Sequence, residues 1–102
     1  MKLITAALLA TMATAAQAER TAMDICTAWG YTASLVMKSR QIGVPLSTTL
    51  TAWDDISPLQ YQLVMDAYDT PRYRTPSIVA EVIEDFRNDQ EYKCFDAFSE
   101  GA

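Results

Sequence analysis

The chain of 102 residues has no histidine, three glycines and two cysteines. Without histidine it lacks the most common general base and the most common metal ligand of proteins. The glycines, Gly30, Gly43 and Gly101, form no glycine-rich phosphate loop and no G-x-S-x-G elbow. Two cysteines alone cannot supply the four ligands of a structural zinc site. These absences argue against an enzyme and against a bound metal or cofactor.

Positive charge is also scarce, because 8 Lys and Arg residues face 13 Asp and Glu residues, for a formal net charge of −5. With no basic cluster, nucleic acid and anionic membrane surfaces are poor partners. Asp54 and Asp55 would point about 100° apart on a helix, which is poor geometry for paired-acid catalysis. Glu81, Glu84 and Asp85 share the outer face of an expected helix. We interpret both groups as solvated surface.

Residues 1–18, MKLITAALLATMATAAQA, have the pattern of a signal peptide. The basic Lys2 precedes an apolar run, and Ala-Gln-Ala at 16–18 has the small residues of a cleavage site. The run is shorter than the ~20 apolar residues that a membrane-spanning helix needs. We expect a soluble mature domain of residues 19–102 in the periplasm, or secreted if the host lacks an outer membrane. The alternative is that the first residues form an N-terminal core helix.

Cys26 and Cys94 are the two cysteines of the expected mature domain. In an oxidising compartment such a pair favours one structural disulfide, and a small domain with little core needs such a staple. Because the bond would close most of the mature chain into one loop, it should stabilise the fold by roughly 4 kcal/mol. A reactive thiol is the alternative.

The segment from 21 to 43 has the pattern of an amphipathic helix around which the domain is built. Its apolar residues recur at steps of three and four, which places them on one side of a helix. Gly43 can adopt the left-handed conformation that ends a helix, and Pro45 keeps the helix from resuming. Later segments must cover the apolar side, since one helix cannot bury its own face. The side comprises Ile25, Trp29, Ala33, Val36, Met37 and Ile42.

Three further segments have helical patterns. Residues 48–56 should form a short second helix. Ser-Pro at 57–58 with Gln60 forms a capping box that starts a third, and Thr-Pro at 75–76 starts a fourth that should reach about Ala97. The expected apolar faces are Leu59, Leu63, Val64, Ala67 and Tyr68 on the third helix, and Ile78, Val79, Val82, Ile83, Phe86, Cys94 and Phe98 on the fourth, where Gln90 is the polar interruption.

No segment has the strict alternation of a strand or the turn residues of a hairpin. The sequence therefore predicts an all-α fold, a small bundle of about four short helices in a single domain, clamped by one disulfide. A second copy could cover apolar surface that the four helices leave open, so a homodimer is one of the possibilities.

The segment from Asp69 to Arg74 is the best candidate for a binding site. Two guanidinium groups, Arg72 and Arg74, flank Tyr73 between two prolines. Arginine and tyrosine are favoured anchors of protein interfaces. The structural alternative is that one arginine pairs with Asp66 or Asp69 while Tyr73 packs over the edge of the core. The sequence leaves both interpretations open.

The segments RQIGVPLS (40–47) and AYDTPRY (67–73), with a cysteine before them and a Glu-rich last helix that carries a second, resemble a set of small exported helical proteins of proteobacteria and their phages. The resemblance implies a bacterial or phage origin and a periplasmic location, and it carries over no catalytic residue. In architecture alone, the expected signal peptide, helical body and end-to-end disulfide are similar to Spackle-type phage periplasmic proteins, which inhibit a phage lysozyme.

Two functions follow as hypotheses. The first is a binding or inhibitory protein that acts on a protein partner in the periplasm. The second is an acid- or envelope-stress chaperone, because protonation of 13 carboxyl groups would leave the chain strongly positive and could expand a small domain. An enzyme is the least favoured class, for want of a base, a nucleophile or a metal set.

Overall fold

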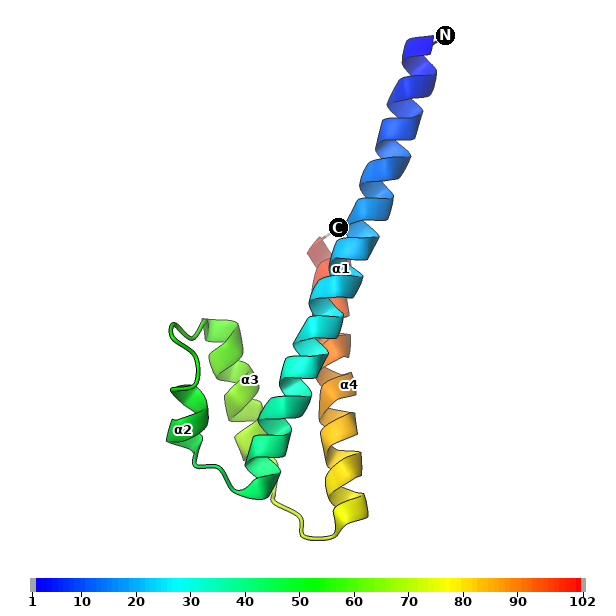
Figure 1. The fold of residues 1–102 in the computed structure, drawn as a ribbon. Coiled ribbons are helices and arrows are strands. Elements are labelled where there is room, and N and C mark those ends of the chain that lie inside the picture. Colours follow the sequence, from blue (N-terminus) through cyan, green and yellow to red (C-terminus); the bar gives the residue numbers. More distant parts are fainter. Residues whose placement is uncertain (1, 102) are drawn as a thin grey trace.

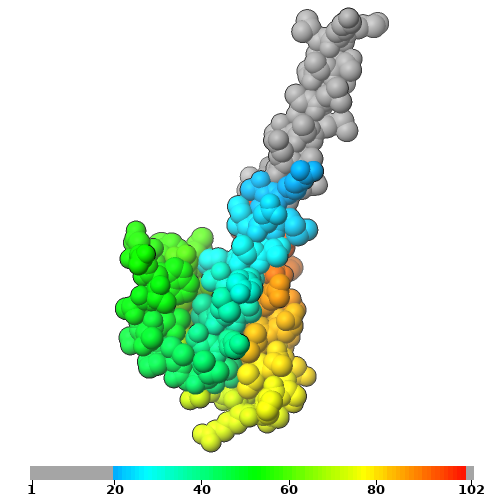
Figure 2. Space-filling view, viewed as in Figure 1, coloured from blue at the N-terminus to red at the C-terminus, as the bar shows by residue number. Residues whose placement is uncertain are grey.

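The computed structural model describes the backbone of residues 2–101 and the side chains of residues 20–100. It contains four helices: α1 (Lys2–Ile42), α2 (Leu46–Leu50), α3 (Pro58–Asp69) and α4 (Pro76–Gly101). No strand occurs in the described part, so the all-α prediction is confirmed. Helix α4 runs antiparallel beside α1 (Figure 1), and α2 and α3 form a lobe beside this pair (Figure 2).

The predicted signal peptide, residues 1–18, lies outside the residues whose side chains are described, and it stays a prediction. Within the described residues, no helix combines the length and the apolar character that a bilayer crossing requires.

A disulfide joins α1 to α4. Cys26 and Cys94 are bonded across 68 positions of sequence, with their Cα atoms 5.5 Å apart. Cys26 is completely buried. The predicted pairing is confirmed, and it holds the C-terminal half of α4 against α1.

The hydrophobic core lies where α1 faces α3. Ala33 and Ala67 are both fully buried, and because their side chains are small the two helices can approach closely. Burial of each large apolar side chain in such a core contributes roughly 1.5–3 kcal/mol. The buried cluster is Ala33, Val36, Met37, Leu63, Val64 and Ala67, and Trp53, Val82, Ile83 and Phe86 are among the partly buried side chains packed against it.

At Gly30 the side chain of Glu91 from α4 lies directly against the backbone of α1. Gly30 is buried, and a Cβ atom there would overlap the side chain of Glu91. The Glu91 carboxylate is held in place by Arg87, whose Nε lies 3.3 Å from its Oε1. Only a hydrogen atom fits at position 30 while Glu91 keeps this place.

The ends of two helices follow their sequence signals. Gly43 has φ 91°, its N–H donates to Arg40 O (3.2 Å), and Val44 N–H donates to Ser39 O (3.0 Å). These are the two bonds of a Schellman motif, which satisfies carbonyls left free at a helix end. At the start of α3, Ser57 and Gln60 form the predicted capping box, with bonds of 3.1 and 2.9 Å.

Helix α2 differs from the prediction, because it begins at Leu46 and ends at Leu50 rather than running from 48 to 56. The Thr51 hydroxyl donates to Ser47 O (2.9 Å) and approaches Thr48 O (3.2 Å), which closes the last turn. Three of the four residues from 48 to 51 are β-branched threonines, which are weak helix formers. The second helix is therefore too short to cover a large apolar face.

We expect the disulfide to supply much of the stability of the fold. Replacing both Cys26 and Cys94 with alanine should lower the free energy of unfolding by about 4 kcal/mol, because the unfolded chain then regains the entropy that the crosslink removes. Urea unfolding followed by circular dichroism measures the loss. The wild-type protein treated with dithiothreitol is the control and should unfold at the midpoint of the variant. An unchanged midpoint in both would contradict the prediction.

Candidate functional site

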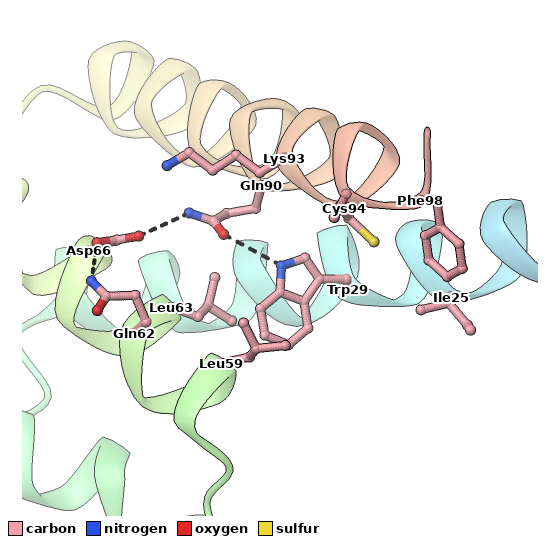
Figure 3. A pocket seen from close by; sticks show the side chains of 11 residues that line it. Ile25, Trp29, Leu59, Gln62, Leu63, Asp66, Gln90, Lys93, Cys94 and Phe98 are labelled. Atoms are coloured by element: carbon pink, nitrogen blue, oxygen red, sulfur yellow. Dashed lines mark hydrogen bonds between the residues drawn. The ribbon is translucent and has the colours of Figure 1, made fainter. Parts of the chain in front are cut away.

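An apolar groove of about 700 Å³ lies between α1, α3 and α4 (Figure 3). Trp29 and Ile25 come from α1, and Leu59 and Leu63 come from α3. Helix α4 contributes Cys94, so the disulfide lies at the groove, and beyond it Ala97 and Phe98. The groove is thus built by three helices, α1, α3 and α4.

Three side chains of the groove lie on apolar sides of helices that we expected other segments to cover, yet all three are exposed. Leu59 is 74% exposed, Ile25 49% and Phe98 38%. Each belongs to the apolar side of its own helix, as its spacing indicates, but α3 and α4 each pack mainly on α1 and touch each other only locally, as at Gln90 and Asp66. No described segment covers the place where the three apolar sides meet. The exposed surface is therefore continuous with the core rather than scattered.

One end of the groove carries a chain of hydrogen-bonded polar side chains (Figure 3). Trp29 Nε1 donates to Gln90 Oε1 (3.4 Å), and Gln90 Nε2 donates to Asp66 Oδ2 (3.5 Å). Gln62 Nε2 donates to Asp66 Oδ1 (2.8 Å). Gln90 is only 4% exposed, and these bonds satisfy its amide, as a buried polar group requires. The polar interruption on the apolar side of α4 thus ties α1 and α3 to α4.

Asp66 is the charged group of this polar end. It accepts from two amides, and a carboxylate has about four lone-pair sites, so it retains acceptor capacity. Lys93, the cation in the groove lining, is paired with Asp89 at 3.1 Å. Among residues 20–100, Asp66 forms no ion pair. The groove therefore has an apolar end and an anionic end.

The loop predicted to bind a partner is attached to the end of α1. Gln41 is 4% exposed, donates from Nε2 to Pro71 O (2.9 Å), and accepts at Oε1 from the Tyr73 N–H (2.8 Å). Arg72 Nε donates to the Gln41 carbonyl (3.2 Å). Arg74 is exposed and has no hydrogen bond or ion pair within the described side chains.

The arginines of the loop differ in their environments. The Arg72 guanidinium lies over Gly43 and covers the end of α1, where a cation is favoured by the helix dipole. Neither Arg72 nor Arg74 pairs with Asp66 or Asp69 within residues 20–100, contrary to the structural alternative. Tyr73 is 38% exposed, so part of its side chain is covered by the protein and part faces solvent. A binding role for Arg72, Tyr73 and Arg74 stays a prediction.

A bond from Arg40 also attaches the loop to the end of α1. Arg40 Nε donates to Thr70 O (3.0 Å), and its guanidinium lies 5.3 Å from the centre of the Tyr68 ring. The Tyr68 hydroxyl donates to Val44 O (2.6 Å) and therefore accepts from Thr49 (2.7 Å). These bonds fix α2 and α3 to the end of α1.

Sequence reasoning missed the groove and the role of Gln41. A signal for Gln41 was present, because it follows Ala33 and Met37 at steps of four and so lies on the buried side of α1. In the described part of the chain, no three Cys, Asp or Glu side chains are placed to hold a metal ion. No known protein family, curated protein or solved structure matches the chain.

Gln41 should be essential for the position of the loop. Gln41→Leu leaves the Tyr73 N–H and the Pro71 carbonyl without their partner, which costs about 1–3 kcal/mol of unfolding free energy. Arg74→Ala is the control and should leave stability unchanged. Urea unfolding of both variants measures the difference. Equal stability of the two would show that the Gln41 bonds contribute nothing.

Proposed function

We propose that this chain is a small exported binding protein that acts on a protein partner and performs no catalysis. The groove between α1, α3 and α4 is its binding surface. The observation that carries this proposal is the convergence of three exposed apolar side chains, Ile25, Leu59 and Phe98, in one groove with a polar end. Contiguous exposed apolar surface marks interaction sites, and binding sites of bundles lie between helices.

The groove is a better supported surface than the loop at 69–74. The backbone of the loop is fixed by Gln41, and Arg72 is occupied at the end of α1. The Arg74 guanidinium is exposed and makes no hydrogen bond or ion pair within residues 20–100, whereas Tyr73 is only 38% exposed. Two side chains offer less area than the groove, so we assign the loop a secondary role at the edge of the interface.

The absence of catalysis is proposed from the groups that meet in the groove. Gln62 and Gln90 both bond to Asp66, and the remaining polar residue of the lining, Lys93, is paired with Asp89. An activated nucleophile needs a neighbouring base and an orienting third group, and neither the chain composition nor this cluster offers that set.

A second candidate function is an acid- or envelope-stress chaperone. It is favoured by the same exposed groove, which could hold unfolded segments, together with the excess of 13 acidic over 8 basic residues. The two functions differ in selectivity, because a chaperone binds many unfolded chains and an inhibitor binds one folded partner.

Capture from periplasmic extract tests which surface binds. Leu59→Glu places a charge in the groove, and because Leu59 is already exposed the fold should be retained. We expect this variant to lose at least about 90% of the partner that the wild type captures, as truncation of an interface anchor does. The variant Arg72→Ala/Tyr73→Ala/Arg74→Ala should retain most of it.

Tyr92→Glu is the matched control for the groove variant, since Tyr92 is an exposed aromatic side chain of α4 outside the groove. Mass spectrometry should identify the same protein with the wild type and with this control. Loss of the partner with the loop variant alone would transfer the binding role to the loop.

Acid titration separates the two candidate functions. We expect far-ultraviolet circular dichroism and hydrophobic-dye binding to change little between pH 7 and 3, because the disulfide restrains expansion and exposed ion pairs contribute little stability. A steep rise in dye binding with retained helix content, as in an acid-expanded state, would favour the chaperone.

A further inference from the structure

We infer that the occupant of the groove is a basic amphipathic helix of the partner, with its apolar side over Trp29 and a lysine or arginine beside Asp66. The inference rests on the proposed function and specifies the chemistry of the partner. It follows from the shape of the groove, from the exposure of its walls and from its charge.

The shape of the groove is that of a missing helix. In a four-helix bundle each helix packs against two neighbours around a common core. Here α3 and α4 both pack on α1, and beyond the bond between Gln90 and Asp66 the space between them is open as the groove. The five-residue α2 cannot fill that position, because it packs on α3 and α1 at the side of α3 away from α4 (Figure 1). A helix from another protein would complete the bundle.

The exposed walls favour a helix over a small molecule. Leu59 on one wall and Phe98 on the other keep 74% and 38% of their surface in water. Small-ligand sites bury most of the ligand in a concave pocket, whereas a helix in a groove contacts both walls through apolar side chains at steps of three, four and seven. Such a helix could cover both walls at once.

The charge of the groove selects a basic helix. Asp66 has acceptor capacity left and no ion-pair partner among residues 20–100, and a lysine or arginine donor would supply one. The chain as a whole carries a net charge of −5, which attracts a basic segment and repels a second copy of itself. Both the local and the overall charge therefore point to a cationic partner.

A fluorescence titration tests the inference. The chain has two tryptophans, so Trp53→Phe leaves Trp29 in the groove as the only one. The probe is an end-capped 15-residue peptide with leucines on one side of a helix and lysines on the other. We expect it to shift the Trp29 emission and to bind at least about tenfold more tightly than a peptide with glutamates in place of lysines. It should also bind more tightly than a leucine–lysine peptide of shuffled sequence.

Matched variants locate the interaction. Asp66→Asn should weaken binding of the leucine–lysine peptide about tenfold and leave binding of a leucine–glutamine peptide unchanged. Asp85→Asn makes the same change in net charge on the exposed outer side of α4 and should have little effect. Leu59→Ser should weaken the binding of both peptides. Isothermal titration calorimetry with the wild-type chain repeats the comparison without the tryptophan substitution.

Several outcomes would overturn the inference. Equal weakening by Asp66→Asn and Asp85→Asn would show that only the overall charge attracts the peptide. Binding of dodecylamine without binding of either helical peptide would assign the groove to a small amphiphile. A dimer in sedimentation velocity that Leu59→Ser dissociates would assign it to a second copy. If Leu59→Glu abolishes capture of a partner while no peptide binds, the proposed function survives and the basic helix does not.

Discussion

The packing of α1 against α4, fixed by the bond between Cys26 and Cys94, is the constraint on which the rest of the structure depends. Helix α1 supplies the buried side chains that α3 covers, and α4 closes the core from the other side. The groove exists only while α1 and α4 stay together, because Trp29 and Gln90 come from these two helices and are bonded to each other. One covalent link thus stabilises the fold and the candidate site together.

The groove arises from helices of unequal length. Helix α4 has 26 residues, α3 has 12 and α2 has five. Apolar residues continue along α1 and α4 beyond the part that the shorter helices cover. In a domain of this size, leaving such surface uncovered forgoes stabilisation that a further helix would provide. We therefore interpret the exposure as a property related to binding, with the stability deficit offset by the disulfide.

Local sequence signals predicted much of the fold. The capping box at 57–60, the glycine at 43 and the two cysteines each act through their own chemistry, and the structure confirms them. Periodicity also assigned Leu59 to the apolar side of its helix correctly. It could not indicate whether another helix covers that side, because this depends on the lengths and angles of all the helices. For this reason the groove could not be predicted from the sequence.

For the loop at 69–74, too, the nearby sequence features were predictable but the contact with a distant residue was not. Its two prolines and its two arginines were evident, and a pairing with nearby Asp66 or Asp69 was the natural structural expectation. Arg72 instead contacts the Gln41 carbonyl, 31 positions earlier in the chain. Every residue has a backbone carbonyl, so the residue type does not indicate which carbonyl a side chain will bind.

The contact between Gly30 and Glu91 links a buried position outside the groove to the geometry of the groove. Gly30 is not part of the groove lining. It follows the lining residue Trp29 directly, and Glu91, which covers it, follows the lining residue Gln90. A methyl group at position 30 would displace Glu91 and act on the spacing of α1 and α4 beside the Trp29–Gln90 bond. A substitution at this buried residue, which is not part of the groove lining, could thus change the width of the groove.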